Sequence, residues 1–221
     1  MMQAMEIKPE TPWDGTPDIS ARIIVAISRV ASVLRAGMWG FATAEHLNPA
    51  QAEILQLLRG RRHGVRLSWL AAQLSVSAAS ASDSVAALAA KGLVKKARAE
   101  DDRRASALWL TEAGAALAER MAGALGFADD AAAALDRGLQ EQLLVGLFKL
   151  IAELQKNERF PALRTCLSCR YFEPNAFPGS AAPHHCALVK APLPIAFLRI
   201  DCAEHEPTDA LTERRNWAAF A

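Results

Sequence analysis

The stretch from Leu67 to Thr111 constrains the fold of this chain more than any other part of the sequence. Apolar residues recur at helical spacing at its start, which predicts a short helix with one apolar face: Leu67, Leu70, Ala71 and Leu74. Residues 75–77 (SVS) interrupt this pattern, and the Ser77 hydroxyl can accept a hydrogen bond from a free amide of a second helix. Two helices joined by so short a turn are expected to form a helix-turn-helix.

The second predicted helix runs from Ala78 to Lys91 and leads into a charged hairpin. Its inner face is expected to consist of Ala81, Val85, Leu88 and Ala89. Gly92 stands where a helix ends in a left-handed residue. Strand-like runs at residues 93–94 and 108–110 enclose an almost entirely charged segment. Directly after a helix-turn-helix, such a hairpin is expected to be a wing.

Three runs within this stretch resemble the MarR family of bacterial transcription regulators: LAAQLSVS (70–77), AALAAKGLV (86–94) and DDRRASALWLTEAG (101–114). The wing pattern, from Asp102 and Arg104 into Leu110 and Thr111, is the most specific of these. The resemblance covers roughly residues 19–157. It implies a winged-helix homodimer that binds a pseudo-palindromic, double-stranded DNA operator and dimerises through its first and last helices.

The flanking sequence fits a mainly α fold with a small β wing. A long amphipathic helix is expected from Ile19, and Asn48, Pro49 and Gln51 form a helix start with a capping box. Thr111 is expected to cap a further helix, followed by a weaker join at residues 123–130. A wide apolar stripe follows, of the kind that a second subunit covers: Leu135, Leu139, Leu143, Leu144, Leu147, Phe148, Ile151 and Leu154.

The chain divides into four parts. Residues 1–18 are expected to form an irregular N-terminal arm, and residues 19–157 the winged helix-turn-helix domain with its dimerisation helices. Residues 158–206 form an appendage that holds every cysteine of the chain, and the MarR resemblance does not extend to it. The tail, residues 207–221, has no pattern that predicts a regular element.

The first turns of the second predicted helix are expected to face base edges in the major groove. Serine hydroxyls bond to several bases, and alanine methyls touch thymine methyls. The residues expected to meet DNA in this helix are Ser77, Ala79, Ser80, Ser82 and Asp83. Asp83 departs from the MarR pattern, in which a basic residue is common nearby. The alternative is a solvent-facing Asp83 that never meets DNA.

Positive charge for DNA binding must come from local clusters, because the net charge of the chain is only +1. One cluster precedes the helix-turn-helix and consists of Arg59, Arg61, Arg62 and Arg66. The other lies in the hairpin and consists of Lys95, Lys96, Arg98, Arg103 and Arg104. Arg103 and Arg104 stand at the tip, where guanidinium groups can enter the minor groove.

The four cysteines predict a metal centre. Cys166 and Cys169 form a CxxC pair, Cys186 follows after sixteen residues and Cys202 after fifteen more. Thiolates suit either tetrahedral zinc or an iron–sulfur cluster. Structural zinc usually has two close ligand pairs, whereas this chain has one, so the spacing favours a [4Fe–4S] cluster over zinc. A Cys3His zinc site that uses His184, His185 or His205 is a further alternative, although the preferred ligand set contains no histidine.

These features predict a cytoplasmic DNA-binding regulator that senses redox state, oxygen or iron through its cluster. The chain start has no apolar signal-peptide core, and no apolar run reaches the ~20 residues of a membrane span. The second hypothesis keeps DNA binding but assigns a structural zinc and a small-molecule effector. An iron–sulfur redox protein is the least favoured. The chain is not expected to be an enzyme, because it has no nucleotide loop, nucleophile–base pair or paired carboxylates.

Overall fold

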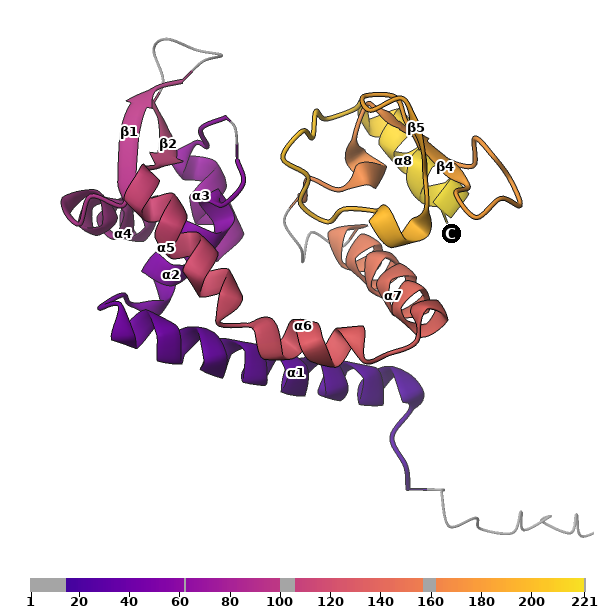
Figure 1. The fold of residues 1–221 in the computed structure, drawn as a ribbon, viewed down its shortest axis with the longest axis horizontal. Helices are drawn as coiled ribbons and strands as arrows, with labels where there is room; N and C mark the ends of the chain where they lie inside the picture. Colours follow the sequence, from indigo (N-terminus) through magenta and orange to yellow (C-terminus); the bar gives the residue numbers. More distant parts are fainter. Residues whose placement is uncertain (1–14, 62, 100–105, 157–161, 221) are drawn as a thin grey trace, which may run out of the picture.

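The computed structural model describes residues 15–61, 63–99, 106–156 and 162–220. Figure 1 shows a winged-helix lobe and a C-terminal lobe, with a long helix along the base. This helix is α1 (Ile19–Ala44), as the apolar spacing from Ile19 predicted. The fold is mainly α with small antiparallel sheets, which confirms the predicted fold class.

The winged-helix lobe has the predicted element order. It consists of α2 (Pro49–Leu58), α3 (Leu67–Leu74), α4 (Ala78–Ala90), β1 (Val94–Arg98), β2 (Ser106–Leu110) and α5 (Glu112–Gly123). Asn48 and Gln51 form the capping box of α2, with Asn48 Oδ1 accepting from Gln51 N at 2.9 Å. Ser77 caps α4 and Thr111 caps α5 in the same way. Gly92 has the expected left-handed backbone, with φ +70°.

The core of this lobe lies among α2, α3, α4, α5 and the wing. Ile54, Leu70, Leu88 and Met121 are fully buried there. The inner face of α4 is narrower than predicted, because Ala89 is exposed while Ala81, Val85 and Leu88 are buried. The wing strands are longer than the two apolar runs suggested, since the antiparallel register extends from Val94 opposite Leu110 to Arg98 opposite Ser106.

Gly114 sets how closely α5 approaches the wing. A Cβ atom at this position would collide with the carbonyl oxygen of Leu93. Thr111 closes the same corner, because its hydroxyl donates to Gly92 O at 2.6 Å and accepts from Gly114 N at 3.0 Å. The small residue at position 114 is therefore a requirement of packing.

We expect Gly114→Ala to lower the free energy of unfolding by about 3 kcal/mol, the upper range for an added methyl that must displace its surroundings. Urea unfolding followed by circular dichroism measures this change. Gly123→Ala, at the other end of α5, is the matched control because a Cβ there meets no atom within 4 Å. Equal stability of the two variants would contradict the close approach.

The chain returns along α1 through α6 (Gly126–Ala133) and then enters α7 (Arg137–Lys156). The predicted weak join at residues 123–130 is thus partly helical. Figure 1 shows α6 beside α1, and a Cβ atom at Gly37 would lie only 3.1 Å from the Phe127 ring. The apolar stripe of α7 is divided, because Phe148 is fully buried within the chain while Leu139 and Leu143 are about half exposed.

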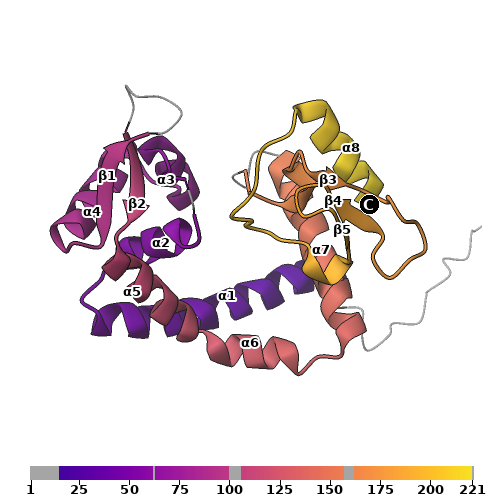
Figure 2. The same cartoon turned by 45° about the horizontal axis from the view of Figure 1, so that its top comes forward.

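The C-terminal lobe is built on α7, as Figure 2 shows from a second angle. Its elements are η1 (Cys166–Ser168), β3 (Phe172–Glu173), β4 (His184–Cys186), β5 (Ala191–Leu193), η2 (Ile195–Phe197) and α8 (Ala210–Phe220). The three strands form one antiparallel sheet in sequence order. Phe148, Leu167, Phe172 and Leu198 form a second core, against which Trp217 and Phe220 of α8 pack. The tail, for which no regular element was predicted, therefore ends in a packed helix.

Along α1, large apolar side chains remain exposed on the single chain: Ile19, Ile23, Ile24, Val25, Val30, Val33 and Trp39. Ala42 is its only residue among those described that is fully buried. Neither α1 nor any other described helix combines the length and apolar character that crossing a membrane would need.

Candidate DNA-binding surface and cysteine site

The amino-terminal half of α4 presents a polar surface to solvent. Its predicted DNA-contacting residues are all exposed: Ser77, Ala79, Ser80, Ser82 and Asp83. Ser77 Oγ accepts from Ser80 N at 3.1 Å and lies 2.9 Å from Ser80 Oγ, so these two hydroxyls are placed together at the helix start. Because these side chains are already exposed, they can offer hydrogen-bonding groups to base edges without a rearrangement of the helix.

The position of α4 is fixed by Lys91, for which the sequence predicted no role. Lys91 Nζ donates to His46 O at 2.6 Å and to Gln51 Oε1 at 3.0 Å. Gln51 is itself part of the α2 capping box, so the end of α4 is tied to the start of α2. The one sequence signal for this role is that Lys91 precedes Gly92 and therefore lies at the end of α4.

The wing strand β1 carries three exposed basic residues, Lys95, Lys96 and Arg98. Arg103 and Arg104 lie outside the described residues, and their contact with DNA stays a prediction. The other basic cluster is partly used within the protein. Arg59 pairs with Glu119 at 3.5 Å, and the Arg61 side chain is only 8% exposed and pairs with Asp201, so Arg61 is not a DNA contact in this arrangement.

The four cysteines come together in the C-terminal lobe. Cys166, Cys169, Cys186 and Cys202 line one cavity of about 40 Å³. The remaining walls are mainly apolar and consist of Tyr171, Phe172, Leu188, Leu193 and Glu204. Cys166 begins η1, Cys186 ends β4 opposite Phe172, and Cys202 follows η2. All four thiols are free rather than paired in disulfides.

Arg199 donates hydrogen bonds to two of the thiols. Its backbone N–H lies 3.3 Å from Cys166 Sγ, and its Nη1 lies 3.7 Å from Cys202 Sγ. Burial raises the pKa of the Cys166 thiol to about 11, although the Arg199 hydrogen bond lowers it. The neighbouring thiols raise this pKa further. The Cys166 thiol therefore keeps its proton at neutral pH unless a metal displaces it.

The three histidines considered as alternative metal ligands make hydrogen bonds away from the cysteine cavity. His205 Nε2 lies 3.0 Å from Ser168 Oγ, and His185 Nδ1 lies 2.9 Å from a Glu173 carboxylate oxygen. His184 Nδ1 accepts from Asn175 N, while its buried Nε2 has no partner among the described residues. None of the three lines the cysteine cavity in the part of the chain that the structure describes. Whether any of these histidines binds a metal stays a prediction.

The side chains as they stand do not converge on one ion. Across the described residues, no group of three or more His, Cys, Asp or Glu side chains is placed to hold a single metal ion. The thiols thus surround a shared cavity without meeting the tetrahedral arrangement, with sulfur about 2.3 Å from the metal, that zinc requires. The metal-ligand role of the four cysteines stays a prediction.

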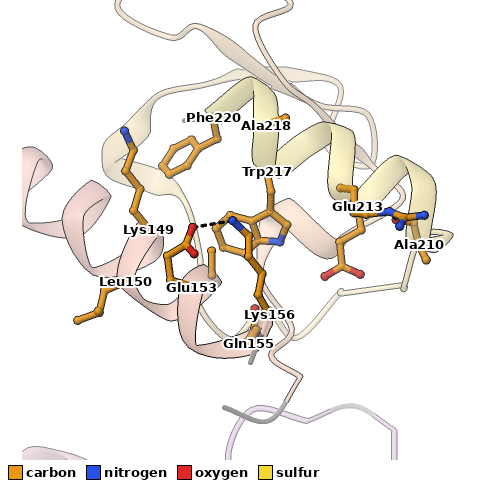
Figure 3. A pocket seen from close by; sticks show the side chains of 12 residues that line it. Lys149, Leu150, Glu153, Gln155, Lys156, Ala210, Glu213, Trp217, Ala218 and Phe220 are labelled. Atoms are coloured by element: carbon orange, nitrogen blue, oxygen red, sulfur yellow. Dashed lines mark hydrogen bonds and ion pairs between the residues drawn. The ribbon is translucent and has the colours of Figure 1, made fainter. Parts of the chain in front are cut away.

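A larger groove of about 790 Å³ lies between α7 and α8 (Figure 3). Trp217 and Phe220 form its apolar side, and the Lys156–Glu153 ion pair, at 2.6 Å, lies on its α7 side. This groove is lined by α7 and α8 alone, and no residue of the winged helix is part of its lining. The effector therefore also stays a prediction.

Comparisons with known proteins agree with this geometry. Residues 47–114 match the family model described as a winged helix DNA-binding domain. The comparison with curated proteins finds no match.

Among solved structures, the chain is similar to a MarR family transcriptional regulator from Silicibacter pomeroyi (23% identity, 62% of this chain, 92% of that chain, TM-score 0.54). It is also similar to Streptococcus pneumoniae FabT in complex with DNA (18% identity, 63% of this chain, 99% of that chain, TM-score 0.52). A third is Rhodococcus jostii CouR bound to p-coumaroyl-CoA (20% identity, 66% of this chain, 98% of that chain, TM-score 0.50).

These identities are low, so the likeness to solved structures shows the fold alone. Each of these structures is matched over nearly its whole length, whereas a large part of this chain is not matched. Residues 47–114 therefore match a winged helix DNA-binding domain, and the fold around them is similar to that of a MarR family transcriptional regulator.

Proposed function

We propose that this chain is a transcription regulator that binds a double-stranded DNA operator as a homodimer and senses redox state, oxygen or iron through a [4Fe–4S] cluster. The observation that carries the DNA-binding part is the exposed polar start of α4 beside a basic wing strand, in a domain of the winged-helix type. A helix presented in this way fits the major groove, while the wing reaches the neighbouring backbone or minor groove.

The dimer is supported by the surface of α1. A helix of 26 residues with so many exposed apolar side chains is unfavourable in water unless a partner covers it. The exposed half of the α7 stripe, with Leu139 and Leu143, offers a second apolar face. A two-fold dimer would pair these surfaces and present two copies of α4 to a pseudo-palindromic operator.

The cluster is supported by the chemistry of the cysteine cavity. In a [4Fe–4S] cluster each iron binds its own cysteine thiolate. The four cysteine sulfur atoms therefore surround a four-iron cluster instead of binding one common metal ion. Four thiols that line one mainly apolar cavity could supply such a ligand set. The cluster would supply a redox-active centre, and the N–H groups of Arg199 would stabilise the negative charge of two of its thiolates.

We expect serine and lysine substitutions to affect DNA binding differently. Ser80→Ala and Ser82→Ala should relax base preference with little change in salt dependence, because hydroxyls act on base edges. Lys95→Ala and Lys96→Ala should weaken binding to all sequences and reduce the log–log salt slope by ~0.9 for each lost phosphate contact. The same reduction is expected for Arg103→Ala and Arg104→Ala on the basis of sequence alone.

The measurement uses duplexes that the wild-type protein selects from a random-sequence pool, titrated at several salt concentrations. Lys149→Ala, an exposed lysine of α7 remote from the winged helix, is the control and should leave both properties unchanged. Failure to enrich any sequence would contradict the proposed function. An unchanged preference in both serine variants would mean that another face of α4 meets the groove.

A further inference from the structure

Arg61 is held firmly by the winged-helix lobe. It follows α2, and its Nε donates to Leu57 O at 2.6 Å. Its guanidinium carbon lies 4.1 Å above the Trp69 ring, which belongs to α3. With only 8% of its side chain exposed, Arg61 has exchanged solvent for these two contacts. Its position therefore reports the position of α2 and α3.

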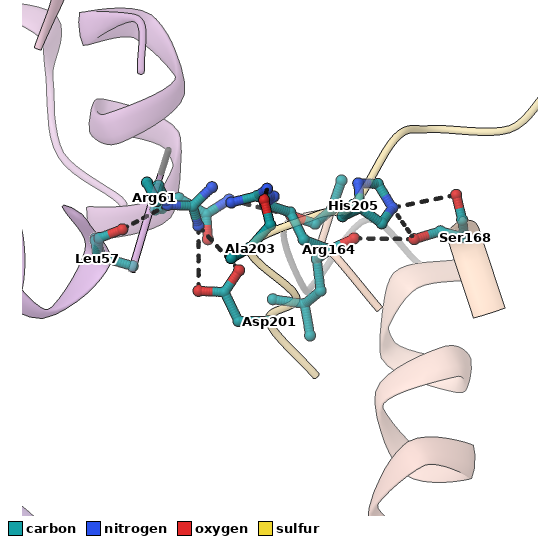
Figure 4. Close-up of polar contacts among 10 residues, drawn as sticks. Leu57, Arg61, Arg164, Ser168, Asp201, Ala203 and His205 are labelled. Carbon is teal, nitrogen blue, oxygen red and sulfur yellow. Dashed lines mark hydrogen bonds and ion pairs between the residues drawn. The ribbon is translucent and has the colours of Figure 1, made fainter. Parts of the chain in front are cut away.

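The free side of the same guanidinium reaches the C-terminal lobe. Arg61 Nη2 lies 3.2 Å from Asp201 Oδ1 and 3.3 Å from Asp201 Oδ2, as Figure 4 shows. Asp201 directly precedes Cys202, one of the four cysteines of the cavity. An ion pair thus joins the lobe that carries α4 to the residue beside a proposed cluster ligand.

The backbone around Asp201 is fixed from the other side by Arg164. Arg164 O accepts from Cys202 N at 3.0 Å, and Arg164 Nη2 donates to Ala203 O at 2.6 Å. His205 N donates to Cys202 O at 3.2 Å, so residues 202–205 form a turn that begins at Cys202. Because Asp201 directly precedes Cys202 in the chain, a movement of the Cys202 backbone also displaces Asp201.

Charged groups from both lobes act on Arg61 at this junction. Burial lowers the pKa of Arg61, while Asp201 raises it and Arg164 lowers it. Asp201 pairs with Arg61, whereas the Arg164 guanidinium donates to Ala203 O. Removal of the Asp201 charge would leave Arg61 with the repulsion from Arg164 and without the attraction that offsets it. A second contact crosses the same junction, from Gln73 Nε2 of α3 to Ala162 O at 3.3 Å.

We propose that the Arg61–Asp201 ion pair transmits the state of the four-cysteine site to the winged helix. The inference rests on the proposed function and names how its site is regulated. When Cys202 is a cluster ligand, the turn is fixed and Asp201 holds Arg61, which keeps α3 against the C-terminal lobe. Loss of the cluster frees the turn, and the ion pair opens. Since α3 packs on α4, the spacing of the two recognition helices in a dimer then changes.

The test is amide hydrogen exchange of the full chain, which needs no operator. The protein is reconstituted under argon with ferrous iron and sulfide and compared with the same protein stripped by chelator and oxidant. In the wild type, cluster removal should speed exchange in residues 67–74 by about fivefold, the ratio that a partly exposed ion pair supports. Asp201→Asn should show the faster exchange already with its cluster bound, at unchanged iron and sulfide content.

Glu173→Gln is the matched control, because it removes the same charge from the same lobe but from a pair with His185 inside that lobe. It should behave like the wild type. A cluster-dependent difference of wild-type size in Asp201→Asn would overturn the proposal, as would wild-type protein that gains and loses its cluster with no change in α3. A chain that takes up no iron and sulfide would contradict the proposed cluster itself, and the transmission falls with it.

Discussion

Cys169→Ser is expected to abolish binding of iron and sulfide, while the wild-type chain purified under argon contains both. Cys169 is the most buried of the four cysteines, at 8% exposed, and no fifth cysteine exists to replace it. A serine hydroxyl is not a soft thiolate and stays protonated at neutral pH, so one iron would lose its protein ligand. Iron, acid-labile sulfide and zinc analysis with visible absorption spectra measures the outcome.

The winged-helix lobe should survive this change. Its hydrophobic core does not include any residue of the cysteine cavity, so helical content and melting of residues 47–114 should stay close to wild type. His185→Gln is the control for histidine ligation and should retain the full cluster, since its ring faces Glu173. If the wild-type protein contains stoichiometric zinc and no sulfide, the cluster assignment is wrong and the site is a structural zinc site.

Leu143→Glu is expected to raise the dimer dissociation constant by about a hundredfold or more. Leu143 is about half exposed on the single chain and lies on the uncovered part of α7. In a dimer built from α1 and α7, the new carboxylate would be buried without a partner, which costs several kcal/mol. Analytical ultracentrifugation over a concentration series measures the shift from dimer to monomer.

Leu211→Glu provides the comparison, because Leu211 is a similarly exposed apolar residue on α8 rather than on either proposed dimer helix. It should sediment like the wild type. If Leu143→Glu stays fully dimeric while Leu211→Glu dissociates, the dimer uses α8. The assignment of α1 and α7 to the interface would then be wrong.

The winged helix could be predicted from the sequence because its signals are local. Asn48, Ser77 and Thr111 each cap a helix within three residues of themselves, and Gly92 ends α4 through its own backbone freedom. Helix α8 could not be predicted in this way. Its aromatic residues Trp217 and Phe220 pack on Phe148, which lies about seventy residues earlier in the chain, and no local pattern indicates this contact.

The site shows the same division between local and distant information. The cysteine spacing predicted a shared site, and the fold does bring the four thiols to one cavity. Arg61 was counted with the basic DNA-binding cluster because nothing near it in the sequence indicates Asp201, which is 140 residues away. Arg199 was missed for a related reason, since its two thiol contacts depend on the turn after η2 rather than on any motif.

Operator affinity before and after cluster removal, on one anaerobic preparation at fixed salt, tests most directly whether this chain is a cluster-dependent regulator. Both states are titrated with the same selected duplex, and iron and sulfide are measured on each. We predict that the two dissociation constants differ by about tenfold or more, a coupling of ordinary size between two sites of one protein. Equal constants, with the cluster present in one state and absent in the other, would contradict a sensing role.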